Sequence, residues 1–127
     1  DLVRSRGLGD VYKRQVEGVY FSNHYAPEAD NPVAKKFIEA YKAEYKIQDP
    51  PDALAALAYD AGLMLFDAIK KAGSTDSTKI KEAINATKDL DAVSGKISLD
   101  KDRNPVKPAV IITIKGGKQV YVETVNP

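Results

Sequence analysis

Apolar residues recur with a helical period between Pro32 and Lys46. They fall on one stripe, while lysines and glutamates occupy the opposite side, so the pattern predicts an amphipathic surface helix. Asn31 can cap this helix, and proline suits its first position because the N–H that proline lacks would have no partner there. The apolar stripe consists of Val33, Phe37, Ile38, Tyr41 and Tyr45.

The longest apolar pattern runs from Ala53 to Ala72 and predicts a second helix. Its residues are apolar on nearly every side, so we expect this helix to be mostly buried. Asp52 precedes it as a capping residue, and Gly73 is placed to terminate it.

A third, shorter helix is predicted to begin near Ser77, a candidate N-cap. Its inner face would consist of Ile80, Ala83, Ile84 and Thr87.

Runs rich in β-branched and aromatic residues predict strands before and after the helices. The last two flank Gly116-Gly117, which favours a tight turn and hence a terminal hairpin. Polar segments at Asn23–Pro27 and Lys101–Asn104 read as loops. The predicted strands are Val16–Ser22, Gly95–Asp100, Ala109–Ile114 and Gln119–Val125.

Composition agrees with one globular α/β unit. The 127 residues are 43% hydrophobic and 29% charged, which is typical of a folded domain rather than a disordered chain. The net charge of +1, with acids and bases interspersed, gives no electrostatic footprint for nucleic acid. Because cysteine is absent, a disulfide framework and a thiol nucleophile are excluded.

The segment Asp1–Gln15 differs from the rest of the sequence. It lacks both sustained periodicity and the apolar core of a signal peptide, and it resembles translated sequencing-adapter runs. We interpret it as a non-native or disordered leader, with a flexible native arm as the alternative.

Motifs for catalysis or metal binding are largely missing. His24 is the only histidine, so a triad or a histidine-rich metal site would have to be built around it. Asp100, Asp102 and Asn104 match the opening of a calcium loop, but Pro105 replaces the required glycine and Ile111 stands where the bidentate glutamate belongs. We therefore expect no catalytic residue, no cofactor and no metal.

Several segments, in order, resemble the C-terminal third of leucine/isoleucine/valine-binding proteins of ABC transporters. They are VEGVYFSNHY at 16–25, the helix from Asn31-Pro32 through Phe37 and Tyr41, DALAALAYDA at 52–61, GKISLD at 95–100 and the closing hairpin. The resemblance extends over residues 16–127.

The resemblance implies the C-terminal portion of a type I periplasmic-binding fold, in which two α/β lobes are joined by three crossovers. Residues 16–27 would form a second-lobe strand and a hinge segment. Residues 28–105 would supply helices and a strand of the first lobe, and residues 106–127 a hairpin of the second.

It also implies capture of a leucine-, isoleucine- or valine-like amino acid for an ABC permease, without enzymatic activity. The protein would be a monomer without nucleic-acid partners, periplasmic or extracytoplasmic, and lipid-anchored in a Gram-positive host. Helix N-termini facing the cleft could meet the amino-acid carboxylate.

By the same resemblance, the groups that hold the ligand's carboxylate and ammonium lie upstream of Val16. The candidate ligand-binding residues of this chain are His24 and Tyr25 in the hinge loop and Asp52 and Leu54 at the start of the second helix. Two alternatives remain open: a ligand-sensing domain of the same fold in a regulator or receptor, and a small α/β enzyme built around His24.

Overall fold

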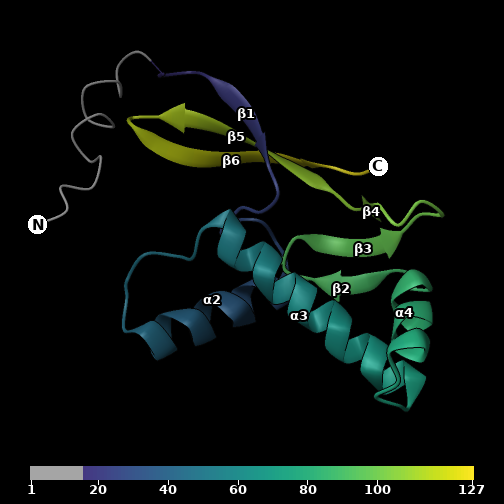
Figure 1. Ribbon diagram of the computed structural model, residues 1–127. Helices are drawn as coiled ribbons and strands as arrows, with labels where there is room; N and C mark the ends of the chain where they lie inside the picture. Colours follow the sequence, from purple (N-terminus) through teal and green to yellow (C-terminus); the bar gives the residue numbers. More distant parts are fainter. Residues whose placement is uncertain (1–15) are drawn as a thin grey trace, which may run out of the picture.

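The computed structural model describes residues 16–127, which form two small antiparallel sheets and three helices (Figure 1). The leader predicted at residues 1–15 lies outside the described residues. One sheet has the strand order β1-β5-β6 and the other β2-β3-β4. The strands are β1 (Tyr20–Asn23), β2 (Leu90–Ala92), β3 (Gly95–Leu99), β4 (Pro105–Val106), β5 (Ala109–Lys115) and β6 (Lys118–Val125).

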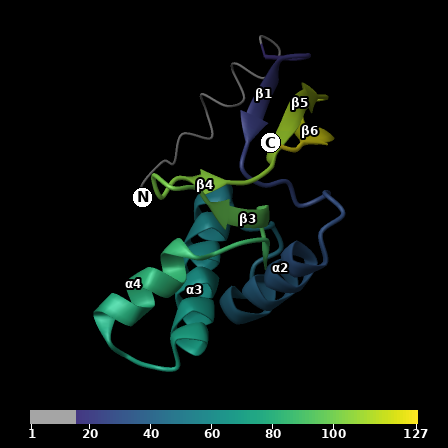
Figure 2. The same cartoon turned by 90° about the vertical axis from the view of Figure 1, so that its right-hand side faces the viewer.

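The helices α2 (Pro32–Tyr45), α3 (Ala53–Ala72) and α4 (Ser77–Asn85) lie on the side of the β2–β3–β4 sheet. Figure 2 shows the same division from the side, with the β1–β5–β6 sheet set apart from the helices and the short β3 and β4 strands between them. Segments from both ends of the described chain thus form one sheet, and the segment between them forms the helical part. The predicted α/β class is confirmed.

Local capping sets the ends of the first two helices, as the sequence predicts. The Asn31 side-chain oxygen accepts the N–H groups of Val33 and Ala34 at 2.9 and 3.3 Å, and Lys46, with a φ of 52°, follows the last residue of α2 as its C-cap. Asp52 accepts the Ala55 N–H at 2.8 Å, and α3 ends at Gly73.

The predicted cap of the third helix is wrong by one residue. Asp76, not Ser77, accepts the N–H of Lys79, at 3.0 Å, and Ser77 is already the first helical residue. An aspartate carboxylate is a strong acceptor at a helix N-terminus, so it takes precedence over the neighbouring serine.

The strands match the sequence patterns unevenly. The terminal hairpin is confirmed, and the left-handed φ values of Gly116 (59°) and Gly117 (70°) supply its primed turn. The first strand begins only at Tyr20, because residues 16–19 form a turn closed by the Val19 N–H and the Val16 carbonyl at 3.1 Å. The sequence did not predict β2 and β4, which have three and two residues and are too short to show an alternation.

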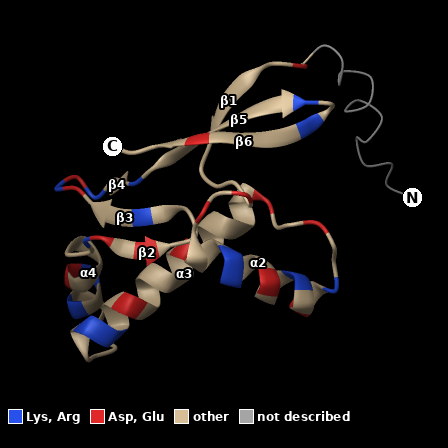
Figure 3. Ribbon diagram, turned by 180° about the vertical axis from the view of Figure 1, so that it is seen from behind, with Lys and Arg blue, Asp and Glu red and all other residues tan. Residues whose placement is uncertain are grey.

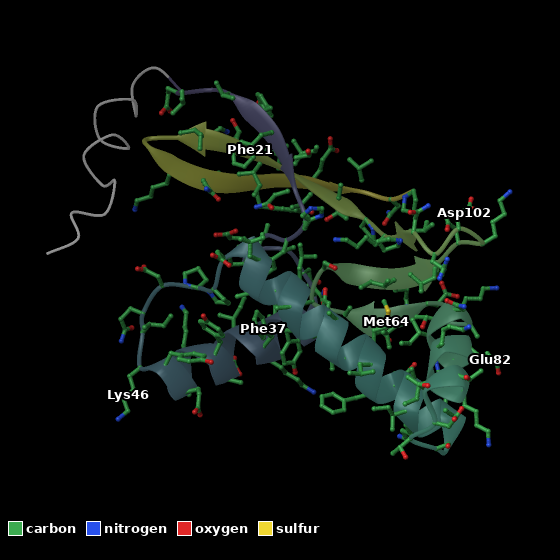
Figure 4. All side chains as sticks on the ribbon, viewed as in Figure 1. Phe21, Phe37, Lys46, Met64, Glu82 and Asp102 are labelled. Atoms are coloured by element: carbon green, nitrogen blue, oxygen red, sulfur yellow. The ribbon has the colours of Figure 1, made fainter. Side chains whose placement is uncertain are left out.

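Two clusters of buried side chains hold these parts together. One joins α2, α3 and the β2–β3 turn, where the Phe37 ring lies 4.6 Å from that of Tyr59 (centroid to centroid; Phe37 is labelled in Figure 4). The other lies on the β1–β5–β6 sheet and contains Val110 and Ile112. Neighbouring residues of one loop serve both clusters, because Tyr25 belongs to the first and Ala26 to the second.

The expectation that α3 is mostly buried is wrong for the described residues. Only the small face with Ala56, Asp60 and Ala68 is buried, whereas Leu54 is 75% exposed and Phe66 70%. α3 packs with that narrow face, and no other part of residues 16–127 covers its opposite side. None of the helices in the described part has the length and apolarity that a membrane crossing requires.

Candidate functional site

A cleft of about 500 Å³ lies where the two sheets approach each other. The segment that connects β1 to α2 forms one wall, the β2–β3 turn forms the second, and the β5–β6 side of the other sheet forms the third. The lining residues are His24, Tyr25, Ala26, Ala29, Asp30, Asn31, Pro32, Val33, Asp91, Ala92, Val93, Ser94, Gly95, Lys96, Pro108, Val110, Tyr121 and Thr124.

The connecting segment brings His24 and Tyr25 to this cleft together. Tyr25 is 4% exposed, and its hydroxyl finds no hydrogen-bond partner among residues 16–127. Burial, with a smaller contribution from the charge of Glu28, raises the pKa of Tyr25 to about 12. The phenol therefore stays neutral at ordinary pH, as a donor and acceptor whose polar atom is unsatisfied.

The β2–β3 turn is fixed by a buried carboxylate of α3. One oxygen of Asp60 accepts the Val93 N–H at 2.7 Å, and the other accepts the N–H and the hydroxyl of Ser94 at 2.9 and 2.6 Å. The Asp60 side chain is 2% exposed, so these bonds compensate a desolvation that would otherwise be costly.

Asn31 binds the carbonyl groups of the same turn. Its side-chain nitrogen donates to the carbonyls of Ala92 and Val93 at 2.9 and 3.0 Å, while its oxygen caps α2. The turn is therefore bonded to α3 through its N–H groups and to the start of α2 through its carbonyl groups.

Charged residues at the rim of the cleft are paired. Lys35 lies 2.7 Å from Asp30 and holds the pKa of that carboxyl below its usual value; Asp91 lies 2.8 Å from Lys96 and raises the pKa of its ammonium group. Exposed pairs of this kind contribute little to stability. Figure 3 shows both signs of charge spread over the helices and sheets.

Asp52 and Leu54 do not line this cleft. They lie at the start of α3, whose neighbouring residues Ala53 and Ala55 pack against the cluster that contains Tyr25. The structure thus brings His24 and Tyr25 into the cleft and leaves Asp52 and the outward-facing Leu54 on an adjoining helix end. The ligand-binding role of all four stays a prediction.

The helix N-termini use N–H groups internally. Asn31 accepts two from α2, and Asp52 accepts one from α3 with a negatively charged group. A carboxylate cap reduces the attraction of that helix end for a second anion. These ends are therefore weaker sites for an amino-acid carboxylate than we expected from the sequence.

Asp60 and the second role of Asn31 were missed by the sequence analysis. A signal for Asp60 was present, because it is the one charged residue between Ala53 and Phe66, and a carboxylate within such an apolar run requires a hydrogen-bonding partner. Its partners lie more than thirty positions away, and the sequence alone does not identify them.

No group of three or more acidic, histidine or cysteine side chains that could hold a metal occurs within residues 16–127. The loop that resembles a calcium loop is closed by its own bonds. Asp100 accepts the N–H groups of Asp102 and Asn104, each at 2.8 Å, and these bonds help to lower its pKa.

Comparison with known proteins gives consistent relatives. A sequence model of the family described as periplasmic binding protein matches residues 5–119. Among solved structures, the chain is similar to a leucine binding protein of Thermotoga maritima MSB8, with 41% identity and a TM-score of 0.78 over 94% of this chain and 35% of the other.

Two further structures are similar over nearly the whole chain. One is a branched-chain amino acid transporter substrate binding protein of Streptococcus pneumoniae in complex with isoleucine, with 34% identity and a TM-score of 0.76 over 91% of this chain and 32% of that one. The other is a solute binding protein of an ABC transporter from R. palustris in complex with benzoate, with 28% identity and a TM-score of 0.76 over 95% and 33%.

No curated protein sequence gave a significant match. The chain spans about a third of the length of the solved structures that it resembles.

Proposed function

The chain belongs to the periplasmic binding protein family, and we propose that it forms the C-terminal part of the amino-acid-binding component of an ABC importer. The similarity to the leucine binding protein of T. maritima, which extends over nearly the whole chain, carries this proposal. The complete protein would capture its solute without chemical change.

In this proposal the two sheets belong to different lobes of the receptor. The β1–β5–β6 sheet would be part of the second lobe, and the helices with the β2–β3–β4 sheet part of the first. The solute would bind between the lobes, and their closure would exclude water and present a closed shape to the permease. The two connections between the sheets would act as hinge segments.

The proposed solute is a leucine-, isoleucine- or valine-like amino acid. Small-molecule sites combine apolar walls with a few polar groups, and this chain offers both near the start of α3. Leu54 presents an exposed apolar side chain there, while the polar residues His24 and Tyr25 line the adjoining cleft. We assign His24, Tyr25, Asp52 and Leu54 to the solute-facing surface.

The proposal places the complete protein outside the cytoplasmic membrane as a monomer that delivers solute to an ABC permease. A lipid anchor in a Gram-positive host is the mode of attachment we propose.

A chimera tests the function directly. Residues 16–127 would replace the structurally matching third of the T. maritima leucine binding protein, and calorimetry would measure binding of leucine, isoleucine, valine and benzoate. We expect saturable binding of at least one branched-chain amino acid. A folded chimera that binds none of the four would refute the proposal, and binding of benzoate alone would refute the solute class.

Substitutions in the same chimera test the site. Leu54→Ala and His24→Ala should each weaken binding by roughly tenfold, since truncating one ligand contact costs about 1–3 kcal/mol. Lys81→Ala, on the exposed surface of α4, is the matched control and should leave the affinity unchanged. Equal affinities for all three variants would remove His24 and Leu54 from the site.

A further inference from the structure

Both connections between the two sheets meet at the β2–β3 turn. Within residues 16–127 the chain passes from the β1–β5–β6 sheet to the helical part through residues 24–31, and returns through residues 107–108. Asn31, at the end of the first connection, donates to the carbonyls of Ala92 and Val93. The first connection is therefore hydrogen-bonded to the turn.

The second connection rests on the turn through Gly95. Gly95 has a φ of 104°, and a Cβ at this position would lie 3.0 Å from Cγ and 3.1 Å from Cδ of Pro108. Glycine is required here both for the backbone conformation and for the close approach of the proline ring. Burial lowers the pKa of the neighbouring Lys107, whose ammonium nitrogen has no hydrogen-bond partner among residues 16–127, and the charge of Asp60 partly opposes this shift.

Within residues 16–127, Asp60 is the α3 side chain that hydrogen-bonds the turn, and Ala56 adds an apolar contact near Val93. The carboxylate takes three hydrogen bonds from two consecutive residues of the turn, at 2.7, 2.9 and 2.6 Å. This geometry fixes the position and orientation of Val93 and Ser94 relative to the helix. The two connecting segments that contact the turn are therefore also held in position relative to α3.

We propose that Asp60 is the positioning residue of a pivot, the β2–β3 turn, which sets the orientation of the β1–β5–β6 sheet relative to the helices. The carboxylate fixes the turn, and the turn fixes both connections through Asn31 and through the contact of Gly95 with Pro108. In the receptor, the pivot would set the balance between open and closed lobes. That last step rests on the proposed function; the pivot does not.

Distance measurements in the 127-residue chain test the pivot without any solute. The chain has no cysteine, so Lys70→Cys and Gln119→Cys allow spin labels to be placed on α3 and on β6. Double electron–electron resonance then reports the distribution of distances between the helical part and the β1–β5–β6 sheet. We expect one narrow distribution in the parent and a broader or shifted one in Asp60→Asn and in Gly95→Ala.

Hydrogen exchange gives a second readout at the turn. An amide has a single acceptor oxygen, which can face Val93 or Ser94 but not both, so Asp60→Asn should speed exchange of the Val93 N–H or of the Ser94 N–H by roughly tenfold, the loss of about one hydrogen bond. Should Asp60→Asn fail to fold, Ser94→Ala removes only the 2.6 Å hydroxyl bond and should broaden the distances less, in the same direction.

Two controls separate positioning from general destabilisation. Asp67→Asn removes a carboxylate of the same helix that pairs with Lys71 at 2.6 Å, and Ile80→Ala loosens α4, away from the turn. Both should keep the parent distance distribution. The proposal is overturned if folded Asp60→Asn keeps the parent distances, if folded Ser94→Ala and Gly95→Ala both keep them, or if Ile80→Ala broadens the distribution as much as these variants do.

Discussion

Asn31 joins a helix cap and a tertiary contact in one side chain. Its oxygen caps α2 and its nitrogen binds two carbonyls of the β2–β3 turn. Replacement by alanine removes the cap and leaves two partly buried carbonyls without this donor. The residue therefore matters more than an isolated cap.

Asn31→Ala should lower the free energy of unfolding by roughly 2–3 kcal/mol. About 1 kcal/mol comes from the lost cap, and the rest from the Ala92 and Val93 carbonyls, which lose their hydrogen-bond donor. Urea unfolding followed by circular dichroism measures this change. Asn85→Ala, at the exposed end of α4, is the matched control and should change stability by less than about 0.5 kcal/mol. Equal losses for the two variants would contradict the double role of Asn31.

Tyr25 makes folding stability depend on pH in the alkaline range. Burial raises its folded pKa to about 12 from the ordinary value of 10.0, so the folded state retains a proton that the unfolded state loses. Its contribution is complete below pH 10 and is lost as the pH rises toward 12. The urea midpoint of unfolding should therefore fall less between pH 9.5 and 11.5 in Tyr25→Phe than in the parent. Urea unfolding of both proteins over the same pH series measures this difference. Identical slopes for parent and variant would show that Tyr25 does not titrate this way.

At the residue scale, local contacts were predictable and distant ones were not. Asn31 and Asp52 were predicted as caps because a cap binds an N–H two or three positions ahead. Asp60 was missed because its partners, Val93 and Ser94, lie 33 and 34 positions away. The prediction that Tyr25 lies at the cleft came from the family resemblance, and not from the properties of the tyrosine side chain.

At the scale of elements, the helices were predictable because their boundaries are encoded by neighbouring residues. The bounds predicted for α3, Ala53–Ala72, are confirmed, as is the strand that begins at Gly95. β2 and β4 exist only because β3 pairs with both, and two or three residues carry no period of their own. Tertiary pairing, not local preference, forms them.

Two glycines associated with α3 should respond to alanine with opposite signs. Gly62 is helical, and a Cβ there meets nothing within 4 Å, so Gly62→Ala should stabilise the chain by about 0.5–1 kcal/mol. Gly73 ends the helix with a φ of 57°, so Gly73→Ala should destabilise it by about 1 kcal/mol. Thermal unfolding of the two variants checks both signs, and the same sign for both would contradict the assigned roles.

At the scale of the whole molecule, the exposed face of α3 is the feature that most needs a partner. Leu54, Leu65 and Phe66 are exposed on a helix that buries only the narrow face with Ala56, Asp60 and Ala68. Soluble proteins rarely leave such contiguous apolar surface uncovered. We attribute this exposed face to contacts with other parts of the proposed receptor. The sequence pattern shows only that the helix is apolar on nearly every side, and it does not identify those contacts.

Phe66→Lys should reduce self-association of the chain and its binding of a hydrophobic dye, with little change in stability, because the side chain is 70% exposed. Sedimentation velocity and dye fluorescence measure these effects. Tyr45→Lys, at the end of α2 and 61% exposed, is the control and should leave both nearly unchanged. An equal effect of the two substitutions would show that the α3 face has no special role.

Calorimetry with leucine, isoleucine and valine tests most directly whether residues 16–127 are one part of a solute receptor. The 127-residue chain and the chimera with the T. maritima leucine binding protein would be titrated under the same conditions. We predict no saturable heat for the chain alone and a single-site isotherm for the chimera. Micromolar binding by the chain alone, or a folded chimera that binds no branched-chain amino acid, would contradict this view of the molecule.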